Sequence, residues 1–446
     1  MPKTIIGAAA GLALLLAGCT STGPNNSQPD TAISAGASHA PTTINVWSFN
    51  HLPNEVAAFK SALARLHTKY PWLTVNFVPN KDDAAFAKAV AAGDPPDVFV
   101  SSAPDNVGKF CSNGTVADLG PFLSSAKVNM GTTFPPATLV YTKYQGKQCA
   151  LPLLTDAYAL YYNKKMFAAA GITTPPKTLS ELTADAKKLT VRKADGSIKT
   201  FGFVSRSDYN GNRYLYTGVQ SANKFYGADG KATFGTDPKW QQLLQWDKTL
   251  GDSYGAANVQ KFVGQYQPHA DDASNPFLTG AAAMEYDGEW HVGEIDAAKK
   301  DLDYGVAPMP VLDSAAGTYG AGLSLGTVAY LPAGSKHRQE GFFALQQLTT
   351  DTTFLNSLAD TVANVPSTFA ALKSWDKASD PHWKPFIDMF ENPGSYYKTL
   401  SAAGEEDMDT WKAFVLKYEQ GKVSDLPGGL SGIAKKIDDA NAQAGQ

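Results

Sequence analysis

The first part of the folded chain alternates strand and helix patterns, and this alternation limits the possible folds more than any other feature. Residues 44–49, 73–78 and 97–100 are short runs rich in β-branched and aromatic residues, as strands are. Residues 53–70 and 83–92 lie between these runs and place apolar residues at helical spacing. The order strand, helix, strand, helix, strand predicts a parallel sheet with right-handed crossovers, and therefore an α/β fold.

The carboxyl ends of the first and third predicted strands carry aromatic and polar side chains. Trp47, Phe49 and Asn50 stand at the end of the first strand, and Ser101 and Ser102 at the end of the third. Because ligands bind beyond the carboxyl ends of strands in open parallel sheets, these residues are candidate ligand contacts. No glycine-rich phosphate loop follows the first strand, which argues against a nucleotide. A formal net charge of −4 without a basic stripe argues against nucleic acid as a partner.

The rest of the chain continues this mixed pattern, and 446 residues are enough for two or three domains. Further helices are predicted over residues 179–189, 239–250, 405–418 and 433–444, and further strands over residues 158–162, 304–307 and 325–331.

The N-terminal residues are predicted to be a targeting segment rather than part of the fold. The apolar stretch over residues 5–17 falls short of the about 20 apolar residues that span a bilayer. It ends in Leu-Ala-Gly before Cys19, a pattern that resembles a bacterial lipobox. That resemblance implies that residues 1–18 are removed as a lipoprotein signal peptide and that Cys19 carries the lipid. The alternative is an ordinary secretory signal with a chance cysteine.

Residues 19–42 are then predicted to be a lipidated cysteine followed by a flexible tether, because Ser, Thr, Pro, Gly and Asn dominate them. This places the folded part at the extracytoplasmic face of the cell membrane. Two cysteines remain, Cys111 and Cys149, and an even pair in an exported protein suggests one disulfide. Two unpaired buried thiols are the open alternative, since a sequence does not show how close the residues lie.

Several segments, in this order, resemble the bacterial extracellular solute-binding proteins of ABC importers, a family that includes the maltose-binding proteins. The segments are residues 44–71, Pro95-Pro96-Asp97-Val98-Phe99, Ala150-Leu151-Pro152 with residues 158–164, residues 277–290 including Gly288-Glu289-Trp290, and residues 305–310. The resemblance spans most of the chain after the tether.

The resemblance implies two α/β lobes, each a mostly parallel sheet flanked by helices, joined by a multi-strand hinge. We expect residues 43–155 plus 322–378 to form the N-terminal lobe and residues 156–321 plus 379–446 the C-terminal lobe. A solute, expected to be a carbohydrate, is then held in the cleft between the lobes and delivered to a membrane permease. The resemblance implies no cofactor and no catalysis, and we expect a monomer.

A sugar presents hydroxyls around apolar C–H patches, so its site needs aromatic faces and fixed hydrogen-bonding groups. The resemblance implies that Asp156 is an acidic ligand contact and that Trp290 stacks on the sugar. Tyr209 belongs to a polar, aromatic stretch suited to the cleft wall, or to an exposed loop. Gly320 and Gly322 allow close backbone approach, although a hinge uses glycines too. Trp411 resembles another stacking aromatic, while its helical spacing from Met408 and Val415 fits a core residue equally.

Competing functions find less support in the sequence. Gly322-Leu323-Ser324-Leu325-Gly326 matches the nucleophile-elbow pattern of serine hydrolases, but a strand pattern follows it where that motif requires a helix. The scattered histidines show no metal-ligand spacing, and the paired carboxylates point apart on their helices. A second alternative keeps the fold and changes the solute, to a polyol or a glycerol-phosphate type.

Overall fold

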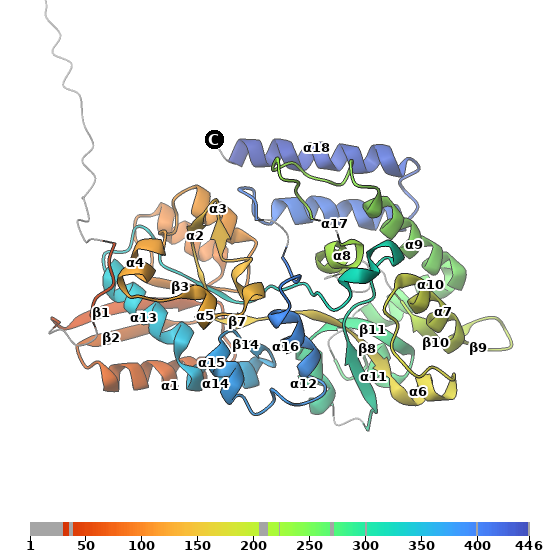
Figure 1. The fold of residues 1–446 in the computed structure, drawn as a ribbon, viewed down its shortest axis with the longest axis horizontal. Coiled ribbons are helices and arrows are strands. Elements are labelled where there is room, and N and C mark those ends of the chain that lie inside the picture. The colour runs from red at the N-terminus through yellow and green to blue at the C-terminus, as the bar shows by residue number, and fades with distance from the viewer. Residues whose placement is uncertain are drawn as a thin grey trace, which may run out of the picture.

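The computed structural model describes residues 30–34, 39–204, 213–222, 224–267, 272–298, 301–397 and 400–444, without the side chains of residues 213–216. Two of the predicted functional residues, Cys19 and Tyr209, lie outside the described residues. Figure 1 shows two α/β bodies side by side along the longest axis, which confirms the predicted two-lobed α/β class. We call the body built on the first sheet the first lobe and the body built on the second sheet the second lobe.

The first lobe contains a five-stranded sheet in the order β2-β1-β3-β13-β6. The strands are β1 (Thr42–Ser48), β2 (Leu73–Val78), β3 (Val98–Ser101), β6 (Leu151–Pro152) and β13 (Val328–Tyr330). β1 pairs in parallel with both β2 and β3, and α1 (Pro53–Lys69) and α2 (Asp83–Ala91) connect them. The predicted strand–helix–strand–helix–strand unit is therefore confirmed. Asp82 starts α2 by accepting a hydrogen bond from the amide of Ala85 (2.7 Å).

The second lobe contains a five-stranded sheet in the order β12-β8-β11-β10-β9. The strands are β8 (Tyr158–Asn163), β9 (Val191–Arg192), β10 (Ile198–Phe203), β11 (Ala282–Gly288) and β12 (Tyr304–Ala307). Only β10 and β11 pair in parallel; the other three pairings are antiparallel. In the first lobe β13 also runs antiparallel to both of its neighbours. Both sheets are therefore mixed, and the prediction of mostly parallel sheets was wrong. β8 and β13 enter their sheets antiparallel where the chain passes between the lobes, and β9 turns directly back into β10.

The chain passes between the two sheets through a short strand pair. β7 (Leu154–Thr155) lies between β6 of the first sheet and β8 of the second, and pairs antiparallel with β14 (Val365–Pro366). An isolated bridge between Asp156 and Leu325 adds a third strand segment at this point. The predicted multi-strand connection is therefore present in the structure.

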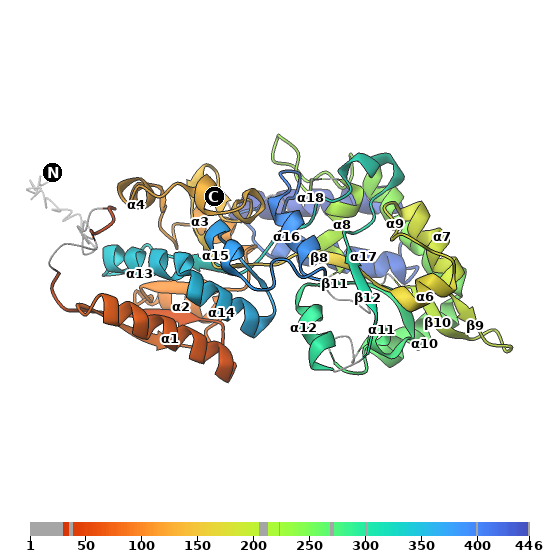
Figure 2. The same cartoon turned by 60° about the horizontal axis from the view of Figure 1, so that its bottom comes forward.

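Helices cover both sheets and extend the second lobe (Figure 2). On the first lobe these are α3 (Asn106–Ser112), α4 (Gly120–Ser125), α5 (Met130–Thr133), α13 (Arg338–Thr350), α14 (Thr352–Val362) and α15 (Phe369–Ser374), with η1 (Pro136–Leu139) and the hairpin of β4 (Lys143–Tyr144) and β5 (Lys147–Gln148). With the second sheet lie α6 (Lys164–Ala169), α7 (Leu179–Leu189), α8 (Arg213–Ser221), α9 (Pro238–Tyr254), α10 (Ala256–Tyr266), α11 (Pro276–Thr279), α12 (Trp290–Ala297), η3 (Asp313–Thr318), α16 (Lys384–Glu391), α17 (Glu406–Glu419) and α18 (Leu426–Ala444).

The predicted helices and strands of the second half are present, with different ends for some. The helix predicted over residues 179–189 has the predicted bounds, because Thr178 and Glu181 form a capping box at its start. The last helix begins earlier than predicted, at Leu426, and the strand predicted over residues 325–331 is reduced to β13. No helix among the described residues has the length and apolar character needed to cross a membrane.

Cys111 and Cys149 are joined by a disulfide, with their Cα atoms 5.8 Å apart. Both side chains are buried in a hydrophobic cluster that includes the stacked rings of Phe86, Phe99 and Tyr330 in the first lobe. The predicted disulfide is confirmed, and the alternative of two free thiols is wrong.

Candidate functional site

The end of β1 presents one aromatic ring and a closed polar turn. Trp47 is partly exposed, and the Lys81 ammonium lies 5.0 Å from its ring centroid. Ser48 and Asn50 are buried, and the Ser48 hydroxyl donates to Asn50 Oδ1 at 2.9 Å. Phe49 is partly exposed and packs against the core of the first lobe. Of these residues Trp47 and Phe49 have surface to offer a ligand, while Asn50 is engaged in the turn.

Of the two serines at the end of β3, Ser101 belongs to an internal hydrogen-bond network and Ser102 lies at the surface. Ser101 is fully buried, and its hydroxyl donates to Asp83 Oδ1 at 2.6 Å, while Asn106 Nδ2 donates to Asp83 Oδ2 at 2.6 Å. Burial raises the pKa of Asp83, and these two hydrogen bonds limit the rise. Ser102 is exposed. Ser102 is therefore the residue of this pair that can reach a ligand in this conformation.

Asp156 lies at the point where the chain leaves β7 for β8. Its side chain is partly exposed, and Asn364, next to β14, donates an amide hydrogen bond to Asp156 Oδ1. The Glu289 carboxyl is its other hydrogen-bonding partner. Burial raises the pKa of Asp156 to about 6, although both hydrogen bonds act to lower it. Asp156 thus stands between a residue of the first lobe and one of the second.

Trp290 opens α12 and is partly exposed. Its ring meets Tyr158 edge to face with the ring centroids 5.3 Å apart. The ring also covers Gly288 so closely that a Cβ atom there would lie 2.3 Å from it, so only glycine fits at this position. Tyr158 lies two residues after Asp156, and Glu289, which hydrogen-bonds Asp156, precedes Trp290 directly. The segments that carry Asp156 and Trp290 therefore meet at the connection between the lobes.

The backbone at Gly320 and Gly322 was expected to approach a ligand closely, and the structure shows other reasons for these two glycines. Gly320 adopts a φ of +95°, which side-chain-bearing residues rarely adopt. Gly322 is buried, its amide donates to Ser395 Oγ, and its carbonyl accepts from the Tyr396 amide at 3.0 Å. A Cβ atom at Gly322 would lie 2.6 Å from the Met389 sulfur. The structure therefore uses Gly322 for packing and for holding the Ser395–Tyr396 backbone.

Trp411 lies in the core, which corrects its assignment as a ligand contact. The side chain is fully buried, stacks on Phe234 with centroids 4.4 Å apart, and donates from Nε1 to Thr217 Oγ1 at 3.2 Å. The helical spacing from Met408 and Val415, which join the same cluster, was the correct signal.

The serine of the elbow-like motif has no catalytic setting. Ser324 is buried in an extended segment whose amide donates to the Tyr396 carbonyl, and its hydroxyl lies 3.5 Å from Thr155 Oγ1. β13 follows, and no helix begins there. His382 stacks on Tyr304 with centroids 4.1 Å apart, and no histidine is among the described contacts of Ser324. The hydrolase alternative lacks the strand-to-helix turn, and no histidine hydrogen-bonds Ser324 among the residues that the structure describes.

A buried charged cluster beneath Trp290 was not predicted from the sequence. His291 is fully buried, with Nε2 2.9 Å from Glu285 Oε1 and Nδ1 2.7 Å from Glu294 Oε2. Burial lowers the pKa of His291, but these carboxylates and Asp287 outweigh it and raise that pKa well above the usual value.

Glu285, Asp287 and His291 could in principle supply three ligands to a metal ion. Both ring nitrogens already face carboxylates, so an internal ion pair accounts for the group without a cation. This cluster could not be predicted from the sequence, because the turn from β11 into α12 brings the carboxylates to the imidazole without a metal-ligand spacing.

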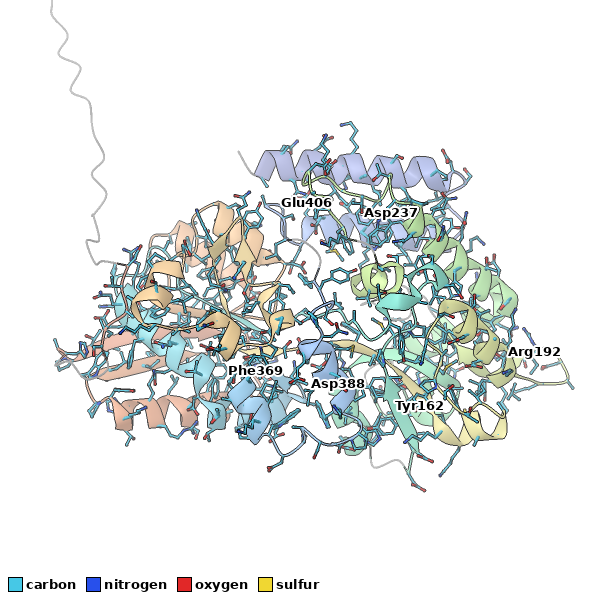
Figure 3. All side chains as sticks on the ribbon, in the orientation of Figure 1. Tyr162, Arg192, Asp237, Phe369, Asp388 and Glu406 are labelled. Carbon is cyan, nitrogen blue, oxygen red and sulfur yellow. A yellow bond between two sulfur atoms is a disulfide. The ribbon has the colours of Figure 1, made fainter. Side chains whose placement is uncertain are left out.

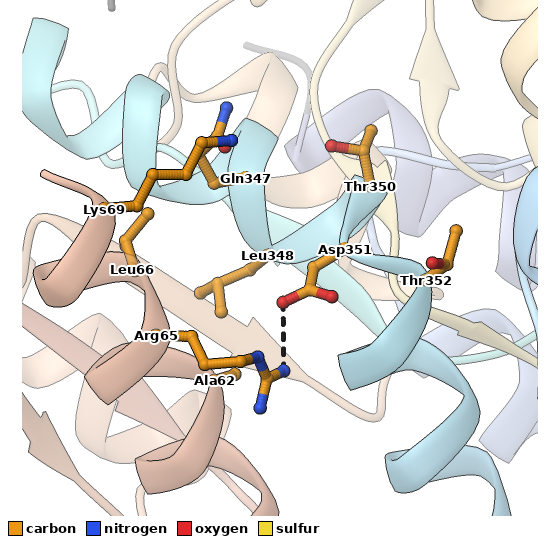
Figure 4. A pocket seen from close by; sticks show the side chains of 9 residues that line it. All are labelled: Ala62, Arg65, Leu66, Lys69, Gln347, Leu348, Thr350, Asp351 and Thr352. Atoms are coloured by element: carbon orange, nitrogen blue, oxygen red, sulfur yellow. Dashed lines mark hydrogen bonds and ion pairs between the residues drawn. The ribbon is translucent and has the colours of Figure 1, made fainter.

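Two pockets lie away from the predicted residues. A pocket of about 460 Å³ is lined by α1 and the junction of α13 and α14, where Arg65 and Asp351 form an ion pair at 3.0 Å (Figure 4). A second, of about 660 Å³, lies between the β4–β5 hairpin and the C-terminal part, and Tyr144, Tyr226 and Tyr396 are among its lining residues. Figure 3 shows side chains of both lobes reaching toward each other around α16, where Asp388 is labelled.

The family model for bacterial extracellular solute-binding proteins matches residues 52–352. This match covers more than half of the chain, and the chain belongs to that family. It is a binding protein rather than an enzyme.

Two curated relatives are 25% identical to the chain over the residues that align. The maltotriose-binding protein of Pyrococcus abyssi is 25% identical over 344 residues, which cover 75% of this chain and 69% of that protein. The diacetylchitobiose-binding protein DasA of Streptomyces coelicolor is 25% identical over 246 residues, 54% of each chain.

Solved structures share the fold at lower identity. The sugar-binding protein MalE of Xanthomonas citri has a TM-score of 0.76 at 18% identity, covering 90% of this chain and 98% of that one. CpMnBP1 with mannobiose bound has a TM-score of 0.74 at 24% identity, covering 89% and 100%. These likenesses establish the two-lobed fold.

Proposed function

We propose that the protein captures an oligosaccharide between its two lobes and delivers it to the permease of an ABC importer. The observation that carries this proposal is the pair formed by Asp156 and Trp290 at the connection between the lobes. The Asp156 carboxylate, which can hold two hydroxyls, hydrogen-bonds Glu289, and Glu289 directly precedes the partly exposed indole of Trp290. Sugar recognition requires this combination of a hydrogen-bonding group and a flat apolar surface.

The remaining contacts are proposed from both lobes. Trp47, Phe49 and Ser102 would contribute from the first lobe, where each has exposed or partly exposed surface. Tyr209 is proposed for the wall of the second lobe. We further propose that the lobes comprise residues 43–155 plus 322–378 and residues 156–321 plus 379–446.

The solute class is supported by what the relatives bind. Their names specify maltotriose, diacetylchitobiose and mannobiose, which are all short oligosaccharides. The sequence before the fold supports a lipoprotein anchored through Cys19, which would keep the binding protein close to its permease.

Binding is proposed to act through a shift between open and closed arrangements of the lobes. A ligand that touches both lobes only when they are closed favours that arrangement by its difference in affinity. The permease would then recognise the closed form, in which the ligand is shielded from water.

A thermal-shift screen tests the proposal. Purified protein is mixed with maltotriose, mannobiose, mannotriose and diacetylchitobiose, and with glycerol 3-phosphate and sorbitol as alternative solutes. A ligand at 100 times its Kd stabilises the native state by about 2.7 kcal/mol, which raises Tm measurably. We expect an oligosaccharide to raise Tm and Trp290→Ala to abolish the rise, while Trp246→Phe, which changes a tryptophan on α9, preserves it. A rise with glycerol 3-phosphate or sorbitol alone would refute the oligosaccharide assignment.

A further inference from the structure

Glu289 connects the candidate ligand residues, although nothing in its sequence position suggests this. It is fully buried and stands directly before α12, yet its side chain caps no amide of that helix. Instead Glu289 Oε2 accepts the amide hydrogen of Ala157 at 2.9 Å, from the chain segment that joins the lobes. The same carboxyl makes a side-chain hydrogen bond with Asp156.

Two carboxyl groups can share a hydrogen bond only if one of them holds a proton. Glu289 Oε1 is buried, and no N–H or hydroxyl partner for it exists among the residues that the structure describes. Asp156 also accepts from Asn364, which suits a carboxylate. The proton therefore belongs on Glu289, which donates it to Asp156.

The electrostatic surroundings agree with this assignment. Burial raises the pKa of Glu289 well above its usual value, and the neighbouring Asp156 charge raises it further. The titratable groups that face the pair are Tyr141, from the segment before β4, and Tyr161 on β8, both with raised pKa values and therefore neutral. Asp287 and Glu285 of β11 are the acidic groups nearby, and their charges also raise the pKa of Tyr161. No cation is among the groups that shift either carboxyl.

The pair lies where the lobes touch. Gly293 on α12 packs against the end of α14, where an added Cβ atom would lie 2.7 Å from Ala363 Cβ, and Asn364 is the next residue. Figure 2 shows α12 and α14 facing each other from the two lobes. Hydrogen bonds thus connect Asn364 of the first lobe to Asp156 in the connecting segment. Further hydrogen bonds connect Asp156 and Ala157 of that segment to Glu289 at the start of α12.

We propose that Glu289 is a positioning residue, which fixes Asp156 relative to Trp290 by tying both the Asp156 carboxyl and the Ala157 amide to the start of α12. This inference rests on the proposed function, in which Asp156 and Trp290 hold the solute. Glu289 itself touches no solute.

The experiment compares Glu289→Gln and Glu289→Ala with the unmodified protein. A glutamine amide donates to Asp156 from its NH₂ group and accepts the Ala157 amide with its oxygen, so it reproduces the protonated glutamate without titrating. Alanine removes the hydrogen bonds that Glu289 makes to Asp156 and to the Ala157 amide, a loss worth about tenfold or more in affinity if it reaches the site. Glu181→Gln is the matched control, because Glu181 also accepts backbone amides, from Lys177 and Thr178 at the start of α7.

Two readouts need no solute. The infrared difference spectrum between the unmodified protein and Glu289→Gln at pH 7 should contain the carbonyl band of a protonated carboxylic acid, whereas the Glu181→Gln difference should contain a carboxylate. Amide exchange of a peptide containing Ala157 should be slow in the unmodified protein and in Glu289→Gln, and at least tenfold faster in Glu289→Ala. A carboxylate band at Glu289, or unchanged exchange in Glu289→Ala, would overturn the proposal even if no sugar bound.

The third readout uses the oligosaccharide that gives the largest thermal shift. We expect Glu289→Gln to bind it within about threefold of the unmodified protein and to lose the fall in affinity at alkaline pH, where ionisation of Glu289 would set two carboxylates against each other. Glu289→Ala should bind at least tenfold more weakly. Equal losses in both variants, or an unchanged pH profile in Glu289→Gln, would contradict the positioning role. Absence of binding by the unmodified protein would refute the proposed function alone.

Discussion

Removing the Cys111–Cys149 disulfide should destabilise one lobe and leave the other unchanged. The disulfide closes a chain segment with a sequence separation of 38 residues, from α3 to the residue after β5. Closing such a loop lowers the entropy of the unfolded chain by about 13 cal/mol/K, or about 4 kcal/mol at 25 °C. The segment contains α4, α5, η1 and the β4–β5 hairpin, which all belong to the first lobe.

The test is the double variant Cys111→Ala with Cys149→Ala, since alanine places no new polar group among these buried side chains. Urea unfolding followed by amide exchange resolves the two sheets, with peptides from β1 and β3 reporting on the first lobe and peptides from β8 and β11 on the second. We expect the first lobe to lose about 2–4 kcal/mol and the second lobe to lose almost nothing. Equal losses in both lobes, or a loss below about 1 kcal/mol in the first, would refute the reasoning.

Three further predictions concern individual side chains. Trp411→Phe should lower stability by about 1–3 kcal/mol, because it removes the hydrogen bond to Thr217 and leaves a cavity, without changing solute affinity in a calorimetric titration. Asp156 has a pKa raised from 3.8 to about 6, so its contribution to stability is full below about pH 4 and is lost as the pH rises through 6. Between pH 4 and pH 7 this loss should lower the free energy of unfolding by up to about 3 kcal/mol. Asp156→Asn should abolish that fall, as measured by urea unfolding at the two pH values. An unchanged fall in the variant would contradict the assignment. Cys19→Ser should abolish incorporation of labelled palmitate and move the protein from the membrane fraction to the soluble fraction; continued labelling would place the lipid elsewhere.

Local patterns were sufficient to predict the first lobe's βαβαβ unit. The spacing of Phe59, Leu63 and Leu66 identified α1, and these side chains are buried against the sheet as expected. The direction of β13 within the sheet could not be predicted, because nothing in its sequence indicates which strands it pairs with. β13 pairs with β3 and β6, which lie far from it along the chain.

The candidate site was predicted in part for a similar reason. Asp156 and Trp290 stand in segments that resemble a known family, and in the structure Asp156 hydrogen-bonds Glu289, the residue before Trp290. Glu289 was missed because its partner Ala157 is separated from it by 132 residues. The burial of Ser101 also escaped prediction, since it depends on Asp83 and Asn106 from α2 and α3.

Small-angle scattering tests the central claim most directly, because that claim is that the two lobes close around an oligosaccharide. The radius of gyration is measured for the purified protein with and without a saturating amount of the oligosaccharide that gives the largest thermal shift, and again for Trp290→Ala. The account predicts a smaller radius with the sugar for the unmodified protein, and no change for the variant. An identical radius with and without a tightly bound sugar would contradict it.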